Sequence, residues 1–497
     1  MPALQHPYYP IIYVRGYAMT QEEIENAVAD PHMGFNLGST KIKQAWDRSI
    51  GMHIFESPLV RLMKDYRYQD SFRDGKAVEG AVPARSIHIY RYYDQASQQI
   101  GSDKTPSIQD AATGLSQLIL KVRDQVCGDD AEARASFKVY LVAHSMGGLV
   151  CRCFLQNSKA GLAEARQLVD KVFTYGTPHN GIDVSMLGFS FNVPSWFGAF
   201  DANNFSRTEM RNYLELPKDC ERVDSLNGCF DPARFFCLVG TDHRDYTLAR
   251  FAVGEMSDGL VKIENAAVAG SPRAYVYRSH SGQFGLVNSE EGYQNLTRFL
   301  FGDTFVTGEL EIDALPLPPR VAAAKEAGKQ VRASYLFEAT VTPRGAFNVN
   351  LTERCADDSS AIFRTFDELL RPANLGRDKP RSPVLFSVFL DSKKIEVGNT
   401  LVFGIKLTVR STDYTVLDEN KTYPAETLFD EHITIRATVK PDGGWRLRYV
   451  LSNQWSEVTG RDIPLNPQTG VARLSLENGK GFSGTLLLDF SLWNRFG

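Results

Sequence analysis

Short apolar runs alternate with longer amphipathic stretches over the first three hundred residues. Six of the runs have the length and composition of buried strands, and they lie at 10–14, 87–92, 137–142, 171–175, 235–239 and 273–277. Ahead of the third run, apolar residues recur at helical spacing from Ile108 to Val126, with Thr105 as a candidate N-cap. Strands that alternate with helices in this way are typical of a mostly parallel sheet with helices on both faces.

We therefore predict that residues 1–305 form an α/β domain, which a helix at 289–301 closes. Insertions at about 17–85 and 183–233 interrupt the alternation.

The pattern changes after Gly302. Residues 306–330 contain the Pro-rich and then Ala/Lys-rich stretch "LPLPPRVAAAKEAGKQ", which we interpret as a linker. Beyond it, period-two runs such as "SYLFEATVT" and "ITIRATVK" and the turn "KPDGGW" indicate antiparallel strands. We predict a β-sandwich domain over residues 331–497. The sequence does not indicate whether this domain binds lipid, a polymer or a partner, or only shields the first domain.

Composition and charge narrow the class of protein. A chain of 497 residues exceeds what one hydrophobic core usually supports. A net charge of −4 provides no long-range field for nucleic acid, and no run of about 18 apolar residues predicts a membrane span. The N-terminus lacks the features of a signal peptide, which predicts a cytoplasmic protein; a trimmed mature form or secretion by another route stays open.

The stretch "KVYLVAHSMGGLVCRCF" (138–154) places Ser145 between a predicted strand and a predicted helix. A sharp turn there projects the hydroxyl clear of the sheet and puts the next N–H at a helix N-terminus, where partial positive charge collects. Ala143, Gly147 and Gly148 are small enough for the close approach that such a turn requires. The pattern is a nucleophile elbow, G-x-S-x-G, with alanine in the first position. The alternative is a structural turn whose serine caps the helix.

A nucleophilic serine needs a base and an orienting carboxylate, which in elbow enzymes follow in the order acid, then histidine. His280 fits the base because it follows the strand-like run "AYVYRS" and precedes the closing helix. Asp258, in "SDGLV", is the favoured acid, and Asp242 and Asp245 remain competitors. For the oxyanion hole, the backbone N–H groups of Tyr17 and Met146 are the candidate donors.

Taken together, these pieces resemble the bacterial lipase and esterase branch of the α/β-hydrolase superfamily. The resemblance is carried over about residues 8–302 by "IIYVRGY", "LVAHSMGGLV", "TYGTPHNGI", "EMSDGLV" and "RSHSGQFGLVNSEEGYQNLTRFLFG". "GTPHNG" is similar to a stretch of bacterial lipases and of inositol-deacylase-like relatives. The resemblance implies the α/β-hydrolase fold, Ser145 as nucleophile, His280 as base, Asp258 as acid, and an oxyanion hole from Tyr17 and Met146. Many family members have His-Gly where this chain has Arg15-Gly16.

The expected activity is hydrolysis of esters with an apolar acyl group, with no metal or cofactor. The stretch "VSMLGFSFNVPSWFGAF" (184–200) is either a lid that opens at a lipid surface or a cap packed permanently on the core. Lipase, esterase, phospholipase and polyester-type activities all stay open on this triad, as does a non-catalytic binding scaffold. Whether Cys220 and Cys229 pair is also left open, as is a bound calcium ion.

Overall fold

The structure is a computed structural model, and it describes residues 4–16, 25–26, 28–44, 48–73, 76–92, 94, 97, 106–182, 202–244, 256–282, 285–345, 349–370, 382–395, 398–440, 444–452 and 460–494. The chain forms two compact units, one of residues 1–273 with 277–301 and one of residues 274–276 with 302–497.

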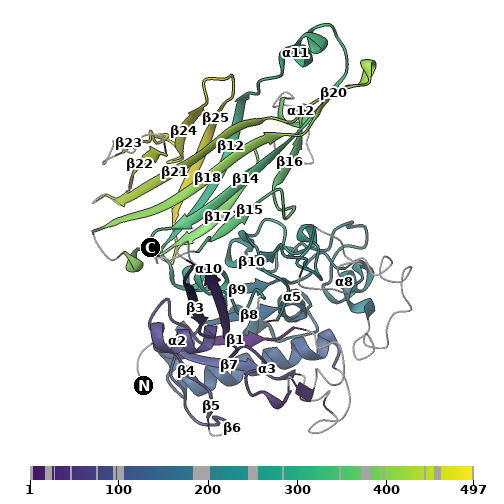
Figure 1. The fold of residues 1–497 in the computed structure, drawn as a ribbon. Helices are drawn as coiled ribbons and strands as arrows, with labels where there is room; N and C mark the ends of the chain where they lie inside the picture. Colours follow the sequence, from purple (N-terminus) through teal and green to yellow (C-terminus); the bar gives the residue numbers. More distant parts are fainter. Residues whose placement is uncertain are drawn as a thin grey trace. The chain divides into compact units, whose positions relative to one another are not determined.

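A seven-stranded sheet forms the centre of the first unit, except that residues 274–276 of its edge strand are grouped with the second unit (Figure 1). Its strands, in spatial order, are β11 (Arg273–Val276), β10 (Phe235–Gly240), β9 (Val169–Tyr175), β8 (Val139–His144), β1 (Ile11–Val14), β7 (Ser86–Tyr90) and β4 (Gln69–Asp70). The pairs from β10 to β4 are parallel. Every residue of β9 and β10 is buried, so both faces of the sheet are covered. The predicted α/β fold and its six strands are confirmed.

The strand order reverses between β1 and β8. The chain leaves β1 toward β7 on one side and leaves β8 toward β9 on the other. At such a switch point the loops diverge beyond the carboxyl ends of the strands, and this is where open α/β sheets bind ligands.

Three long helices cover the sheet: α3 (Ile108–Cys127), α5 (Met146–Gln156) and α10 (Glu290–Phe301). Helix α5 packs on α3 and on strands β1 and β8, and α10 packs on β9 and β10. The N-cap of α3 is Ser107, not Thr105, because Ser107 and Asp110 form a reciprocal capping box. Two short helices, α4 (Ala131–Ser136) and α6 (Ala163–Gln167), precede β8 and β9.

The first insertion contains its own small elements. These are the β2–β3 hairpin (Ser39–Gln44, Ile50–Phe55), α2 (Pro58–Tyr66) and the β5–β6 pair (Phe72–Arg73, Lys76–Ala77). The insertion also contributes β4, which extends the main sheet beyond β7.

The described part of the second insertion packs against the core of the first unit. It contains α8 (Arg207–Tyr213), preceded by a 3₁₀ turn at Ala202–Phe205. Arg152 of α5 is fully buried and donates to the carbonyl oxygens of His179, Val223 and Ser225 at 2.7–2.8 Å. These contacts join α5 to the loop before the insertion and to residues 223–225 within it. The apolar stretch 184–200 lies outside the described residues.

The second unit is a β-sandwich, as predicted. One sheet has the order β17 (Val384–Leu390), β12 (Thr304–Ala314), β25 (Ser483–Leu492), β24 (Ala472–Glu477). The other has the order β15 (Thr352–Arg354), β14 (Ser334–Pro343), β18 (Thr400–Ser411), β21 (Thr427–Val439), β22 (Trp445–Leu451), β23 (Arg461–Asp462), with β16 (Ile362–Thr365) also on β14. Side chains from both sheets form one buried core. A small third sheet joins β13 (Val331–Arg332), β19 (Tyr414–Val416) and β20 (Lys421–Tyr423).

The segment 306–330 is not a linker. Most of β12 lies in it, paired on both sides, and helix α11 (Pro319–Glu326) follows. The strand sequence "TFVTGELEIDA" alternates buried and half-buried positions up to Ile312, a period-two signal that the proline-rich stretch after it obscured.

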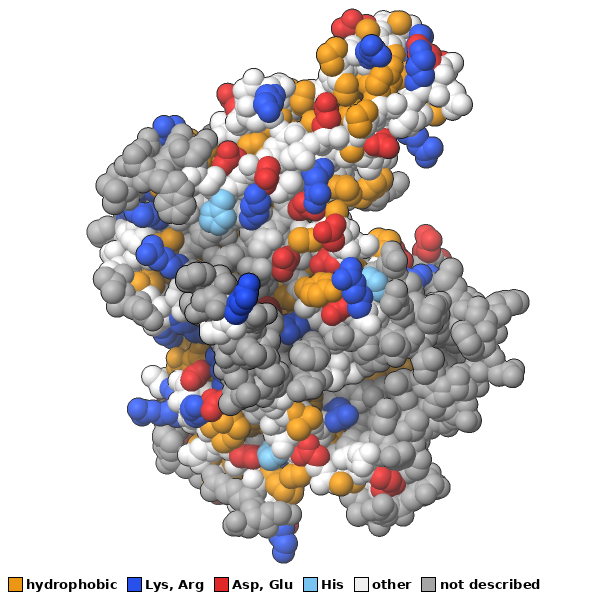
Figure 2. Space-filling model, viewed as in Figure 1, with side chains coloured by type: hydrophobic (Ala, Val, Ile, Leu, Met, Phe, Trp, Pro, Cys, Tyr) orange, Lys and Arg blue, Asp and Glu red, His pale blue; other side chains and the backbone are white. Residues whose placement is uncertain are grey.

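The surface mixes both signs of charge. On the face in Figure 2, basic and acidic side chains are interspersed over the described surface. Among the described residues, no helix is long and apolar enough to cross a membrane.

Candidate active site

Ser145 lies at the tip of a strained turn between β8 and α5. Its backbone has φ 53° and ψ −127°, a region that side-chain-bearing residues rarely adopt. Its side chain does not cap α5, which contradicts the reading of Ser145 as a helix cap. The turn is held because Ser145 N–H donates to the Tyr175 carbonyl at 2.9 Å and Thr177 Oγ1 donates to the Ser145 carbonyl at 2.7 Å. A methyl group on Gly147 would clash with the Val14 carbonyl oxygen at 2.3 Å, so the elbow requires glycine there.

Ser145, His280 and Asp258 lie in one hydrogen-bonded chain. His280 Nε2 is 2.9 Å from Ser145 Oγ, and His280 Nδ1 is 2.8 Å from Asp258 Oδ2. All three side chains are at most 5% exposed. Because the carboxylate only accepts, Nδ1 carries the proton and Nε2 is free to take one from the serine.

The Asp258 carboxylate is fixed by its own turn. Its second oxygen, Oδ1, accepts from the N–H groups of Leu260 at 3.0 Å and Val261 at 2.7 Å. Gly176, at φ 53°, lies against the pair, since a Cβ there would come within 2.9 Å of Asp258 Oδ2. The carboxylate is thus held with one oxygen left for His280.

One of the two predicted oxyanion donors is described. Met146 is the first residue of α5, and the N–H groups of the first turn have no acceptor within their own helix. Tyr17 lies outside the described residues. Gly16, beside it, passes so close to the elbow that a Cβ would lie 2.5 Å from Ser145 Cβ and 2.8 Å from the His144 carbonyl oxygen.

We expect Gly16→Ala to lower kcat for ester hydrolysis by about 100-fold, because the added methyl group must push the loop after β1 away from the nucleophile. Gly80 has no neighbour within 4 Å of its Cβ position, so Gly80→Ala is the matched control. Steady-state kinetics on a soluble ester would measure both variants, and wild-type kcat for Gly16→Ala would place the oxyanion donors elsewhere.

The competing residues have other roles or lie outside the description. Asp242 Oδ1 accepts from Arg244 N–H at 2.9 Å in a local turn, and Asp245 is not described. His179 of "GTPHNG" is fully buried, and its Nε2 is 3.1 Å from Thr174 Oγ1. It shapes the loop after β9.

Buried neutral histidines make the first unit sensitive to acid. Burial holds the pKa of His179 well below its usual value and lowers that of His88 to about 4. In the unfolded chain both titrate near 6.5, so the unfolded state binds more protons below that pH. The free energy of unfolding of the first unit is therefore highest above pH 6.5 and falls as the pH falls, and His88 accounts for about 2 kcal/mol of that fall at pH 5.

His179→Gln tests this pH dependence, since glutamine keeps an Nε2 donor for Thr174 but does not ionise. We expect the opening free energy of the β8 and β9 amides, measured by hydrogen exchange, to fall less between pH 7.5 and pH 5 in the variant than in the wild type. Equal falls in the two proteins would show that His179 is not protonated on opening.

Three residues of the site were not predicted from the sequence. Thr177 and Gly176 follow β9, and His144 precedes the nucleophile; the quoted motifs contain all of them without indicating their contacts. His144 Nε2 lies 2.9 Å from the backbone carbonyl oxygen of His280.

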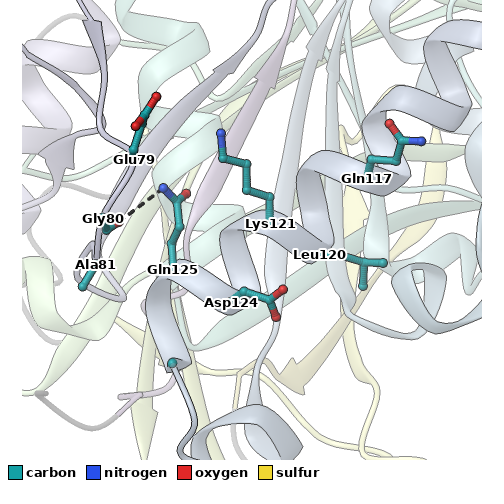
Figure 3. A pocket seen from close by; sticks show the side chains of 9 residues that line it. Glu79, Gly80, Ala81, Gln117, Leu120, Lys121, Asp124 and Gln125 are labelled. Carbon is teal, nitrogen blue, oxygen red and sulfur yellow. Dashed lines mark hydrogen bonds between the residues drawn. The ribbon is translucent and has the colours of Figure 1, made fainter.

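Other features are separate from the triad. A groove of about 640 Å³ on α3, lined by Lys121, Asp124 and Gln125 among others, contains no triad residue (Figure 3).

Within the described ranges, no three acidic, histidine or cysteine side chains lie close enough together to hold a metal ion. Cys220 and Cys229 are both free thiols.

Comparison with protein-family models finds a match within the first unit. Residues 93–223 match the model of the PGAP1-like alpha/beta domain family, a span that includes β8, Ser145 and α5. No curated protein matches the sequence of this chain.

Solved structures that are similar to this chain include a lipase and a phospholipase. Lipase BlEst2 of Bacillus licheniformis, in its propeptide form, is 11% identical over 89% of this chain and 97% of its own, with a TM-score of 0.31. Phospholipase PlaB of Legionella pneumophila is 14% identical over 84% of this chain and 91% of its own, with a TM-score of 0.33.

These TM-scores are low, so the strand order, the elbow and the family match carry the assignment. The first unit of this chain has the α/β-hydrolase fold, and its residues 93–223 are similar to the PGAP1-like alpha/beta domain family.

Proposed function

We propose that the protein is a serine carboxylic-ester hydrolase of the lipase and esterase type. The observation that carries the proposal is the pair of hydrogen bonds that joins Asp258 to His280 (2.8 Å) and His280 to Ser145 (2.9 Å) at the switch point of the sheet. A binding scaffold with no catalytic role has no need of a buried base aligned on a strained serine. That alternative is therefore disfavoured.

The geometry supports a two-step acyl transfer. His280 Nε2 takes the Ser145 proton as Oγ attacks the ester carbonyl, and Met146 N–H stabilises the oxyanion, with Tyr17 N–H as the proposed second donor. The protonated His280 then gives its proton to the leaving alcohol, which departs as the acyl-enzyme forms. Water, deprotonated by His280, attacks the acyl-enzyme and releases the carboxylic acid and Ser145.

We propose an apolar acyl group, on the basis of the Met-, Phe- and Trp-rich stretch 184–200. A phospholipase or a polyester-type hydrolase would use the same triad, and substrate chemistry distinguishes them. The full chain should be assayed on p-nitrophenyl esters from two to sixteen acyl carbons, on emulsified triacylglycerol and on phosphatidylcholine vesicles. Hydrolysis of at least one ester class is expected, and no release above the Ser145→Ala background on any of them would refute the proposal.

A further inference from the structure

His280 lies in a loop, so no strand or helix fixes its backbone. Strand β11 ends at Val276, and helix α10 begins at Glu290. The side chain is oriented by Asp258, but the height of the ring above Ser145 depends on where the loop lies. A displacement of about 1 Å in such a group can cost about 100-fold in rate.

Two contacts hold the main chain of His280. Its N–H donates to the Asp258 carbonyl oxygen at 2.9 Å. Its carbonyl oxygen is 2.9 Å from His144 Nε2. Because a carbonyl only accepts, His144 carries its proton on Nε2 and donates. The residue next to the nucleophile is thus bonded to the backbone of the base.

The His144 ring also lies beside the loop after β1. A Cβ on Gly16 would come within 3.1 Å of His144 Nδ1. On its other side, the ring centroid is 5.0 Å from that of His280, with the planes tilted by 43°. His144 therefore contacts the loop of the base and lies against the loop of the oxyanion hole.

The ring stays uncharged at working pH. Burial, with a smaller contribution from the neighbouring His280, lowers the pKa of His144 to about 3. A neutral ring keeps the single-proton tautomer that the contact requires, and it does not repel the positive charge that forms on His280 during attack.

We propose that His144 is a positioning residue, which sets the distance between His280 Nε2 and Ser145 Oγ by hydrogen-bonding the backbone of His280. The inference rests on the proposed function, since it concerns the same triad.

Glutamine and methionine at position 144 form a matched pair. Glutamine places an Nε2 donor as many bonds from Cα as histidine does, and methionine has a similar length and shape without a donor. His144→Gln should retain at least about a third of the wild-type kcat, whereas His144→Met should lose about 10- to 100-fold in kcat with KM within about twofold.

A double-mutant cycle distinguishes an effect of His144 through His280 from a general distortion of the active site. In a His280→Ala background, where no ring needs placing, His144→Met should cause no further loss. The inference is overturned if both single variants keep wild-type kcat, if both lose it equally, or if the loss in His144→Met persists without His280. A wild-type protein no more active than Ser145→Ala would instead refute the proposed function itself.

Discussion

Replacing Ser145 by alanine should lower kcat for a soluble ester by about 10⁶-fold, while the fold stays intact. The hydroxyl is the group that forms the acyl-enzyme, and alanine removes only that group. Substrate binding and the oxyanion donors remain, so KM should change little. Burst and steady-state kinetics with p-nitrophenyl esters would measure the loss.

Ser158→Ala is the matched control for this variant. Ser158 is exposed, and its hydroxyl bonds Glu215 Oε1 at 2.9 Å. Its loss should leave hydrolysis within about twofold of the wild type. Substantial activity in Ser145→Ala would mean that the elbow is only a turn, and a binding role would then become the better account.

Asp258→Asn should lower kcat by about 10³- to 10⁴-fold. Asparagine still offers Oδ1 to the Leu260 and Val261 N–H groups, so the turn should survive. Its amide would then face His280 Nδ1 as a donor, which forces the proton of the ring onto Nε2. In that tautomer His280 has no lone pair for the Ser145 proton.

Asp242→Asn is the control, because Asp242 follows β10 and was the sequence alternative for the acid. We expect its kcat to stay within about threefold of the wild type, since its Oδ1 only closes a local turn. A large loss in Asp242→Asn together with a small one in Asp258→Asn would reassign the acid.

The sequence predicted the central strands well because they are buried on both faces. Strands β8 and β10 are nearly continuous apolar runs, and no helix period competes with them. Strand β12 was missed since its polar half-buried face and the prolines after Leu315 made it look like a connector. Period two over "FVTGELEI" was the signal that could have identified it.

The candidate site followed from the order of motifs, but its supporting contacts did not. Ser145 and His280 could be chosen because each follows a predicted strand, and Asp258 because an Asp-Gly turn followed by two apolar residues can hold a carboxylate on a rigid corner. The bond from His144 to the His280 carbonyl joins residues 136 positions apart, and nothing in the local pattern of either one indicates it. The N-cap of α3 was misplaced by two residues for a local reason: Ser107 has an acidic partner three positions on.

Covalent labelling of Ser145 by a fluorophosphonate tests the central claim most directly. The reagent forms an Oγ–P bond with release of fluoride only at a serine whose proton a base removes. The account predicts one adduct per chain, mapped by mass spectrometry to the peptide that contains Ser145 and absent from Ser145→Ala. An unmodified wild-type chain, or an adduct on another serine, would contradict it.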